Sequence, residues 1–379
     1  MLYFFTMVIK EIKAKSILRK HKRIDSWFIS CYGMNLYRGC VHNCIYCDGR
    51  NEKYQVNGVF EKEIEVKTNA IDILRKELHP SLRKKPMKKC YIMLGGGVGD
   101  SYQNIEEEYR LTRQTLQLLN NYKLPVSILT KSTLIERDID ILKQINEQSR
   151  ILISFSISSS DDGISSIFEP NVSLPSERLQ TIKKLKKEGI SCGVFLLPVI
   201  PFITDTLEIM NQTLKDINDA GADFIIFGGM TLKKGRQKDY FYQSLKKNYP
   251  NLLVEYENIY KEDKWGQATS QYYASIHETF NVLMKQYSIP KRIPSSLFND
   301  ILSENDCVSV ILDQLDYLCK MQGKRSPYGY ASYQISQLSE PISNMKFNLQ
   351  EIKGVGKVTE GIILEILETG TSKYYEKLL

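Results

Sequence analysis

The chain has 379 residues, of which 42% are hydrophobic and 25% are charged, an ordinary composition for a folded globular protein. This length is enough for one large domain and a smaller one, and disorder is not expected to dominate. The net charge of +7, from 51 basic and 44 acidic residues, is compatible with a phosphate-bearing partner and does not require one.

The cysteines and the first residues bear on the compartment. Five of the eight cysteines lie outside residues 40–47 and are scattered, which is typical of a protein in a reducing cytoplasm rather than of a disulfide-linked secreted domain. The apolar run from Leu2 to Ile9 is too short to span a bilayer, and no small-residue cleavage signal follows it. We therefore expect a cytoplasmic protein without an export signal or a membrane span.

Residues 1–25 form a basic N-terminal segment, with seven lysines and arginines between residues 10 and 23. Such a segment is typical of a solvated surface, and it also suits contact with nucleic-acid phosphate. Residues 27–32 are then predicted to form a strand that leads into the next motif.

Three cysteines, Cys40, Cys44 and Cys47, lie close together in the loop that follows, and Tyr46 directly precedes the last of them. Cysteine thiolates are the usual ligands of iron–sulfur clusters, and a cubane cluster normally takes four. Three ligands leave one iron open to a substrate, as a catalytic metal keeps an open position. The alternatives are a zinc site completed by His42 or a distant cysteine, or three free thiols.

Apolar, strand-like runs alternate with helical periodicity from residue 26 to residue 230, a pattern typical of a parallel sheet wrapped by helices. After 27–32, the predicted strands are 90–94, 126–129, 151–157, 192–197 and 224–227. The predicted helices are 69–78, 106–121, 135–147, 176–188 and 207–220. Six such units predict an α/β fold, a partial (β/α)6 TIM-like barrel, with its chemistry at the carboxyl ends of the strands.

Two strand ends carry groups suited to a ligand. A glycine-rich stretch at residues 95–99 precedes Asp100, and glycine lets backbone approach a ligand closely, although such runs are also common in turns. Lys131 follows the third predicted strand, and Ser156 lies in the fourth. A lysine ammonium at a strand end suits an anion as a point charge, while an exposed surface lysine is equally ordinary there.

Residues 231–345 are polar, rich in tyrosine and lysine, and mostly helical in pattern, so we interpret them as a helical extension. Residues 289–294 contain two prolines and interrupt the helical pattern as an extended linker or turn. Tyrosines and basic side chains together can stack on bases and neutralise phosphate, although ordinary helical surfaces carry the same mixture.

Residues 346–379 contain a short apolar helix, a Gly-Val-Gly turn and a second amphipathic helix. This segment resembles the helix-hairpin-helix motif of family X DNA polymerases, in which backbone N–H groups at a helix N-terminus hold a DNA phosphate without reading sequence. The resemblance implies that the DNA-binding residues are Lys353, Gly354, Gly356, Lys357 and Thr359. The alternative is an αα-hairpin used only for packing.

The cysteine loop resembles the radical S-adenosylmethionine (radical SAM) superfamily, whose hallmark is Cys-x3-Cys-x2-Cys with an aromatic residue before the third cysteine. The resemblance implies that Cys40, Cys44 and Cys47 bind a [4Fe–4S] cluster and that the open iron chelates S-adenosylmethionine. One electron from a flavodoxin- or ferredoxin-type reductant then releases a 5′-deoxyadenosyl radical, which abstracts a hydrogen atom from the substrate.

The same resemblance implies further contacts to S-adenosylmethionine. Tyr46 is expected near the adenine, and the glycine-rich segment is expected at the methionine amino group. Lys131 and Ser156 are expected to engage the carboxylate. The implied cofactor-binding residues are therefore Tyr46, Gly96, Gly97, Asp100, Lys131 and Ser156.

An ordered series of shorter motifs resembles spore photoproduct lyase and its relatives, the DNA repair photolyases, over roughly residues 15–230. The matching segments are Asn35–Cys40, Asp100–Gln103, Leu111–Arg113, Thr130–Ser132, Arg137–Leu142, Phe168–Pro170, Arg178–Leu179 and the loop at Pro198. One departure concerns the cysteine that, in spore photoproduct lyase, returns a hydrogen atom to the product radical. This chain has Gly97 at that position, and we do not assign the role to Cys90.

These patterns together predict a cytoplasmic radical SAM enzyme that binds DNA through its C-terminal hairpin and abstracts hydrogen from a nucleobase or sugar, as a repair lyase. A radical SAM enzyme that modifies RNA or protein is the first alternative. A non-enzymatic DNA-binding protein with a structural metal centre is the second.

Overall fold

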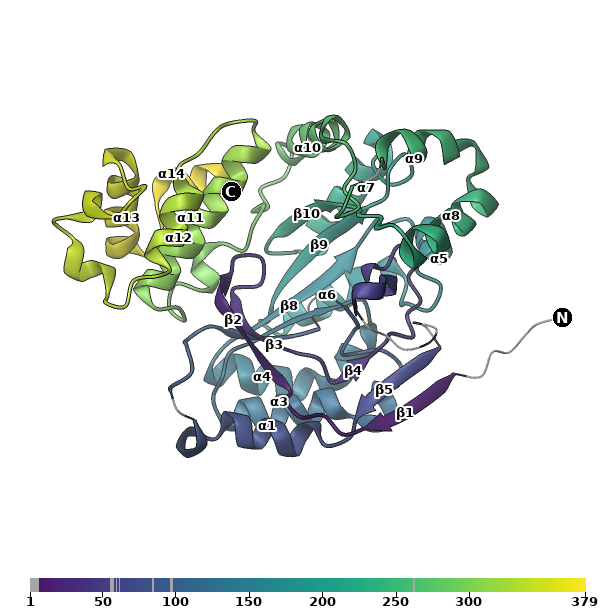
Figure 1. Cartoon of the computed structure of the whole chain (residues 1–379), viewed down its shortest axis with the longest axis horizontal. Coiled ribbons are helices and arrows are strands. Elements are labelled where there is room, and N and C mark those ends of the chain that lie inside the picture. Colours follow the sequence, from purple (N-terminus) through teal and green to yellow (C-terminus); the bar gives the residue numbers. More distant parts are fainter. Residues whose placement is uncertain are drawn as a thin grey trace.

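The computed structural model describes residues 7–54, 58, 60, 62–83, 85–95, 98–261 and 263–379. Its centre is a seven-stranded sheet in the order β10-β9-β8-β7-β6-β3-β2 (Figure 1). Strands β3, β6, β7, β8, β9 and β10 are parallel, and β2 joins the edge antiparallel to β3. The predicted α/β fold with six parallel strands, a partial TIM-like barrel, is confirmed.

The central strands follow the predicted runs closely. They are β2 Leu18–Asp25, β3 Ser30–Met34, β6 Tyr91–Leu94, β7 Val126–Thr130, β8 Ile151–Ile157, β9 Ser191–Val199 and β10 Ile225–Gly229. The first parallel strand begins later than residue 27, because Trp27 and Phe28 lie in the tight turn between β2 and β3, where Ile29 has a φ of 51°. The prediction that 27–32 is one strand was therefore wrong at its start.

The basic N-terminal segment contributes to the central sheet and to a second, small sheet. Its strand β2 extends the central sheet, and β1 (Val8–Ile12) pairs in parallel with β5 (Glu63–Lys67). Strand β4 (Tyr37–Arg38), directly before the cysteine loop, completes the small sheet against β5. Most side chains of β2 are exposed, so its basic residues face solvent while its backbone belongs to the core sheet.

Helices wrap the sheet as the apolar periodicity indicates. They are α1 Ala70–Leu78, α2 Glu106–Tyr109, α3 Leu111–Asn121, α4 Ile139–Gln148, α5 Asp162–Phe168, α6 Pro175–Lys187 and α7 Leu207–Asp219. The predicted helix 106–121 is two helices, because Arg110 adopts a left-handed conformation with a φ of 50° between α2 and α3. A single such residue ends the hydrogen-bond ladder of an α-helix.

The rest of the chain is helical, as predicted for residues 231–345. It contains α8 Arg236–Asn248, α9 Leu253–Ile259, α10 Ser270–Met284, α11 Glu304–Met321, α12 Tyr328–Ile335, α13 Lys357–Thr369 and α14 Lys373–Leu378. Residues 289–294 contain neither helix nor strand, as predicted. Within the described part of the chain, the helices are all too short or too polar to cross a bilayer.

The last helices dock on the amino ends of the parallel strands. The Tyr91 hydroxyl, at the start of β6, donates to the carbonyl of Leu297 at 2.6 Å, and the Ile225 N–H, at the start of β10, donates to Pro290 O at 2.8 Å. The cysteine loop follows β4 and lies at the other end of the barrel. Figure 1 accordingly shows α11–α14 on the left and the small sheet with β4 on the right.

A buried arginine joins this helical unit to the two edges of the open sheet. The Arg292 guanidinium lies 4.3 Å from the ring centre of Trp27, in the β2–β3 turn, and 3.4 Å from that of Tyr317 in α11. The Tyr317 hydroxyl in turn donates to Phe227 O in β10 at 3.2 Å. Arg292 is 2% exposed and its burial lowers its pKa, so the two aromatic rings are its main stabilising contacts.

Replacing Arg292 with Ala should lower the free energy of unfolding by about 2–4 kcal/mol, because it removes two cation–π contacts and leaves a cavity. Urea unfolding followed by the fluorescence of Trp27 and Trp265 measures the change. Arg292→Met retains most of the volume and should recover about half of the loss. The exposed Arg325→Ala is the control, and an equal effect of Arg292→Ala and Arg325→Ala would contradict the role of the stack.

Candidate active site

A cavity of about 230 Å³ opens at the carboxyl ends of the parallel strands. One wall is the cysteine loop, and the others come from residues that follow or end β6, β7, β8, β9 and β10. The predicted residues that line it are Cys40, Cys44, Tyr46, Cys47, Asp100, Lys131 and Ser156. Side chains from distant parts of the sequence thus share one site, as expected at this edge of a parallel sheet.

The cysteine loop is held in a tight turn. Gly39 has a φ of 82°, and a Cβ there would approach Glu63 O to 2.6 Å, so the turn before Cys40 requires glycine. The Cys47 N–H donates to Cys44 O at 3.2 Å, which closes the turn between the second and third thiols. Burial raises the pKa of all three cysteines, so their thiolate forms need a cationic partner.

The geometry fits a cluster better than a single ion. In the described ranges, no three histidine, cysteine, aspartate or glutamate side chains lie close enough to share one metal ion. In a cubane each cysteine binds its own iron, so the ligands lie further apart than those of one zinc ion. The three cysteines nevertheless line a single cavity, and their thiols are therefore suited to an iron–sulfur cluster.

Lys131 lies at the centre of the polar side of the cavity. Its Nζ donates to Ser156 Oγ at 2.7 Å and to Glu169 Oε1 at 2.9 Å, and it lies 5.5 Å from the centre of the Tyr46 ring. The structure therefore brings Lys131, Ser156 and Tyr46 together, although they are separated widely in sequence. An ammonium held at this position can bind a carboxylate that enters the cavity.

Glu169 connects these groups to a second buried cation. Its carboxylate accepts hydrogen bonds from the Tyr46 hydroxyl, Lys131 Nζ and Arg178 Nη2. Glu169 is 2% exposed and Arg178 is 0% exposed. Arg178 also donates to Ser156 O at 2.6 Å, so the same guanidinium holds the strand that carries Ser156.

The charge of Glu169 is set by these partners. Burial alone raises the pKa of a carboxyl group, but the charges of Arg178 and Lys131 outweigh that effect and hold the pKa of Glu169 well below its usual range. Glu169 is therefore ionised at neutral pH. Its one negative charge fixes the phenol of Tyr46 and two cations beside the cavity.

Asp100 orders the strand ends next to Lys131. Its carboxylate accepts from the Thr130 hydroxyl at 2.8 Å, the Lys131 N–H at 2.8 Å and the Tyr102 N–H at 2.8 Å. His42 Nδ1 lies 3.6 Å from the same carboxylate. Asp100 lines the cavity, but its oxygens are used mainly to position Lys131.

The glycine-rich segment is described only in part. Gly96 and Gly97 lie outside the described residues. Gly95 lines the cavity with a φ of 76°, and a Cβ there would approach Leu129 O to 2.6 Å. Cys90 lies before β6, at the opposite end of the strand from the cavity, with its Sγ 3.3 Å from that of Cys31.

Several of the motifs that resemble spore photoproduct lyase do not line the cavity but hold the elements around it. Glu106 is fully buried and accepts hydrogen bonds from the Tyr37 hydroxyl, the Thr112 N–H and Arg137 Nη2. Asp138 binds both Arg137 and Arg113. These residues tie the start of the cysteine loop to α3 and α4, so their contribution to the site is positional.

The predicted DNA-binding residues lie far from this cavity, on the helical unit at the other end of the barrel. The second helix of the motif is present as α13, but the first is only a three-residue 3-10 helix, Leu349–Glu351, instead of the expected short helix. Lys353, Gly356 and Lys357 are exposed, whereas Thr359 is buried. Gly354 has a φ of 88° and packs against Tyr330.

Glu169 is the functional residue that sequence reasoning missed. It was part of a motif, Phe168–Pro170, but a lone glutamate before a proline gives no sign that it is buried. Its partners Tyr46, Lys131 and Arg178 come from three separate elements, and only the fold shows that they converge.

Comparisons with known proteins agree with this site. A family model described as the radical SAM superfamily matches residues 34–217. The uncharacterized protein MJ0683 of Methanocaldococcus jannaschii is 30% identical over 243 residues, which cover 64% of this chain and 84% of the relative. The uncharacterized protein Rv2578c of Mycobacterium tuberculosis is 33% identical over 235 residues, covering 61% of this chain and 67% of the relative. The chain belongs to the radical SAM superfamily, and this family implies a [4Fe–4S] cluster and S-adenosylmethionine as cofactors.

Among solved structures, those of spore photoproduct lyase have a similar fold. Spore photoproduct lyase, in complex with a dinucleoside spore photoproduct, matches with a TM-score of 0.54 and 15% identity over 74% of this chain and 79% of that chain. A second structure of that lyase matches with the same TM-score, 16% identity and coverage of 76% and 80%. At this identity the comparison shows a shared fold.

Replacing Glu169 with Gln should destabilise the protein by about 3 kcal/mol at pH 7, because it leaves Arg178 buried without an opposite charge. The lowered pKa of Glu169 places its stabilising contribution above the pKa of the unfolded chain, about 4.3, and the contribution is lost as the pH falls further. Urea unfolding of the apoprotein should therefore show a difference between wild type and variant that shrinks below about pH 4.

Asp219→Asn is the control for this measurement. It removes an exposed carboxylate that pairs with Lys215, and no measurable change in stability is expected. A difference between wild type and Glu169→Gln that stays constant from neutral to acidic pH would show that Glu169 is not ionised in the folded protein.

Proposed function

We propose that the protein is a radical SAM enzyme that acts on DNA as a repair lyase similar to spore photoproduct lyase. The observation that carries the proposal is the single cavity that Cys40, Cys44 and Cys47 line together with Lys131 and Ser156. Three cysteines leave a cluster iron without a protein ligand, and Lys131 offers a fixed positive charge in the same cavity.

The residues have separate roles in this proposal. Cys40, Cys44 and Cys47 hold the cluster, and Lys131 with Ser156 binds the carboxylate of S-adenosylmethionine. Tyr46 lies beside the adenine. When bound, the cluster and S-adenosylmethionine supply a 5′-deoxyadenosyl radical that abstracts hydrogen from the substrate.

The protein's own contribution is orientation and exclusion of water. Glu169 keeps Lys131 from rotating away, because the ammonium is shared between Glu169 Oε1 and Ser156 Oγ. Asp100 fixes the backbone of Lys131 from the other side. The buried walls of the cavity protect a reactive species from solvent.

DNA recognition is assigned to the hairpin. Lys353 and Lys357 are exposed on either side of the turn, and Gly356 precedes α13 without a side-chain cap, which leaves the first N–H groups of the helix available to a phosphate. A duplex held in this way is not read in sequence. The target nucleotide must leave the base stack to reach the cavity, which favours damaged and weakly paired sites.

A one-electron reductant of flavodoxin or ferredoxin type is part of the proposal. Directly after Cys47 the chain forms two short 3-10 helices, Asp48–Arg50 and Glu52–Tyr54. Beside them Trp265 is 56% exposed, with Lys53 Nζ 4.9 Å and Lys264 Nζ 5.3 Å from its ring centre. A basic rim around an exposed aromatic residue suits an acidic partner next to the cluster loop.

The decisive test is formation of 5′-deoxyadenosine. The protein is reconstituted with iron and sulfide without oxygen, reduced, and given S-adenosylmethionine with ultraviolet-damaged duplex DNA, undamaged DNA or no DNA. We expect 5′-deoxyadenosine formation that is stimulated by damaged DNA. Formation that no DNA changes would retain the enzyme class and overturn the DNA substrate, whereas no formation from an intact reduced cluster would overturn the enzyme.

Cys44→Ala should abolish the cluster absorbance and reduce 5′-deoxyadenosine formation at least 100-fold, because two cysteines cannot hold the cubane. Cys307→Ala, which removes a buried thiol of α11, is the matched control and should retain both. Iron analysis and ultraviolet–visible spectra are the measurements. A Cys44→Ala protein that binds a full cluster would remove this residue from the ligand set.

Gly356→Asp should weaken duplex binding roughly tenfold, because it places a negative charge where a phosphate is expected to bind. Gly356→Ser is the matched control. The backbone at Gly356 is extended, with a φ of −98°, and a Cβ there meets nothing within 4 Å, so both side chains fit and both can cap α13. Fluorescence anisotropy at several salt concentrations measures affinity, and equal binding by the two variants would remove the hairpin as a phosphate site.

A further inference from the structure

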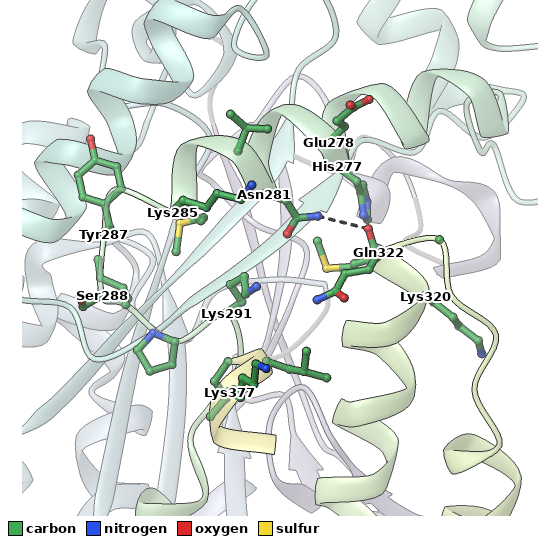
Figure 2. Close-up of a pocket in the computed structure, with 18 of the residues that line it drawn as sticks. His277, Glu278, Asn281, Lys285, Tyr287, Ser288, Lys291, Lys320, Gln322 and Lys377 are labelled. Carbon is green, nitrogen blue, oxygen red and sulfur yellow. Dashed lines mark hydrogen bonds between the residues drawn. The ribbon is translucent and has the colours of Figure 1, made fainter. Parts of the chain in front are cut away.

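A second and larger hollow lies outside the cofactor cavity. It is a groove of about 1070 Å³ between α10, the segment 285–291, the end of α11 and the last residues of α14 (Figure 2). This volume is at the upper limit of a small-molecule site. Figure 2 shows Lys285, Lys291, Lys320 and Lys377 around it, with Asn281 donating to Met321 O across it at 3.2 Å.

The groove follows α10 from Tyr273 to the end of the helix. Tyr273, His277, Asn281 and Lys285 line it, and their spacing of four residues places them on one face of the helix. Tyr273 and Lys285 are 12 residues apart, so the lined face is about 18 Å long. A ligand of that length is a chain rather than a metabolite.

One end of the groove meets the cofactor cavity. The Tyr273 hydroxyl donates to Met230 O at 3.0 Å, and a Cβ on Gly229 would collide with the Tyr273 ring. Gly229 and Met230 both line the cofactor cavity. Tyr273 therefore forms the boundary between the two hollows.

The other end is basic. Four lysines line the groove against two glutamates, Glu278 and Glu376. Glu376 is turned toward Ser295 and Thr371, whose hydroxyls donate to it. Among the described residues, the side chains of Lys285, Lys291 and Lys377 have no hydrogen-bond or ion-pair partner.

Burial makes anion binding more favourable for one of these lysines. The pKa of Lys291 is lowered because the ammonium is partly removed from water. An anion at this position would stabilise the charged form and offset the effect of burial. The basic end thus has both unpaired charge and a group that gains from an anionic ligand.

Helix α12 connects this basic end to the hairpin. Gly323 lines the groove, and Tyr330, seven residues later in the first turn of α12, packs against Gly354 of the hairpin. Tyr328 and Tyr374 of α14 lie 6.2 Å apart between ring centres, which links the start of α12 to the helix that carries Lys377. Lys324 and Arg325 are exposed between the two sites.

We propose that this groove binds an unpaired nucleic-acid strand and leads it from the hairpin to the cofactor cavity. The inference rests on the proposed action on DNA and adds the path of the substrate strand. Lysines at the hairpin end hold phosphates, and the strand passes along α10 to Tyr273, where the target nucleotide enters the cavity.

An unpaired strand fits these features better than a duplex or an acidic protein. Proteins that bind single strands combine a basic groove with aromatic residues on which bases stack, and Tyr273 and Tyr287 both line this groove. A duplex holds its bases paired and stacked, so it offers none to these tyrosines, while an acidic redox partner finds its basic rim at Lys53 and Lys264 beside the 3-10 helices that follow Cys47. The unpaired strand also supplies the unstacked nucleotide that the cavity requires.

The test uses Lys285→Gln/Lys377→Gln in the full-length protein. Anisotropy is measured with a labelled single DNA strand of about 12 nucleotides, and with a blunt duplex, from about 0.05 to 0.2 M salt. We expect the double variant to bind the single strand about tenfold more weakly, with a salt slope smaller by about 1.4, and to bind the duplex as wild type does. Lys76→Gln/Lys187→Gln, on exposed positions of α1 and α6, is the charge-matched control and should change neither.

The outcomes separate this inference from the proposed function. Unchanged single-strand binding by the groove variant overturns the groove while the duplex data still test the hairpin. An equal loss of single-strand and duplex binding overturns the division between the two sites. If wild type binds neither form of DNA, the proposed DNA substrate itself fails, and binding of a single RNA strand alone would transfer the substrate to RNA. Without DNA, the groove variant should form 5′-deoxyadenosine at the wild-type rate. This control would show that the variant is folded.

Discussion

The buried charge of Glu169 is the constraint on which the cofactor cavity depends. An isolated carboxylate is very costly in a protein interior, and Glu169 is stable there only because Lys131, Arg178 and Tyr46 all contact it. Each partner belongs to a different part of the barrel: the cysteine loop, the end of β7 and helix α6. Satisfying one charge therefore fixes the cysteine loop relative to the strands.

The same fold separates the cofactor cavity from the C-terminal hairpin. Parallel strands bring their carboxyl ends together, and this places Cys44, Lys131 and Ser156 around one cavity. The amino ends are covered by α11–α14, which Arg292 joins to both edges of the sheet through Trp27 and Tyr317. The hairpin thus lies at the opposite end of the barrel from the cysteines. Any substrate that uses both must extend along the molecule, and α10 is the element that runs between them.

Local patterns predicted the parts of the structure that depend on local chemistry. Strand 151–157 was predicted with its observed bounds because five of its seven residues are apolar, and Cys40, Cys44 and Cys47 were assigned through the resemblance of their loop to the radical SAM cysteine motif. The break at Arg110 was missed because non-glycine residues rarely adopt the left-handed conformation, and an arginine within a helical pattern gives no sign of it. The ion pairs of Glu169 and the docking of the last helices at the amino ends of the strands arise from contacts between distant segments. Contacts between distant segments produce no periodic pattern in the sequence.

Helix α10 has one more consequence. Helix α10 sets a fixed interval between Tyr273 and Lys285, which are 12 residues and therefore about 18 Å apart along the helix axis. On the proposed path, a strand anchored at Lys285 presents at Tyr273 the nucleotide that lies a fixed distance away, whatever the bases in between.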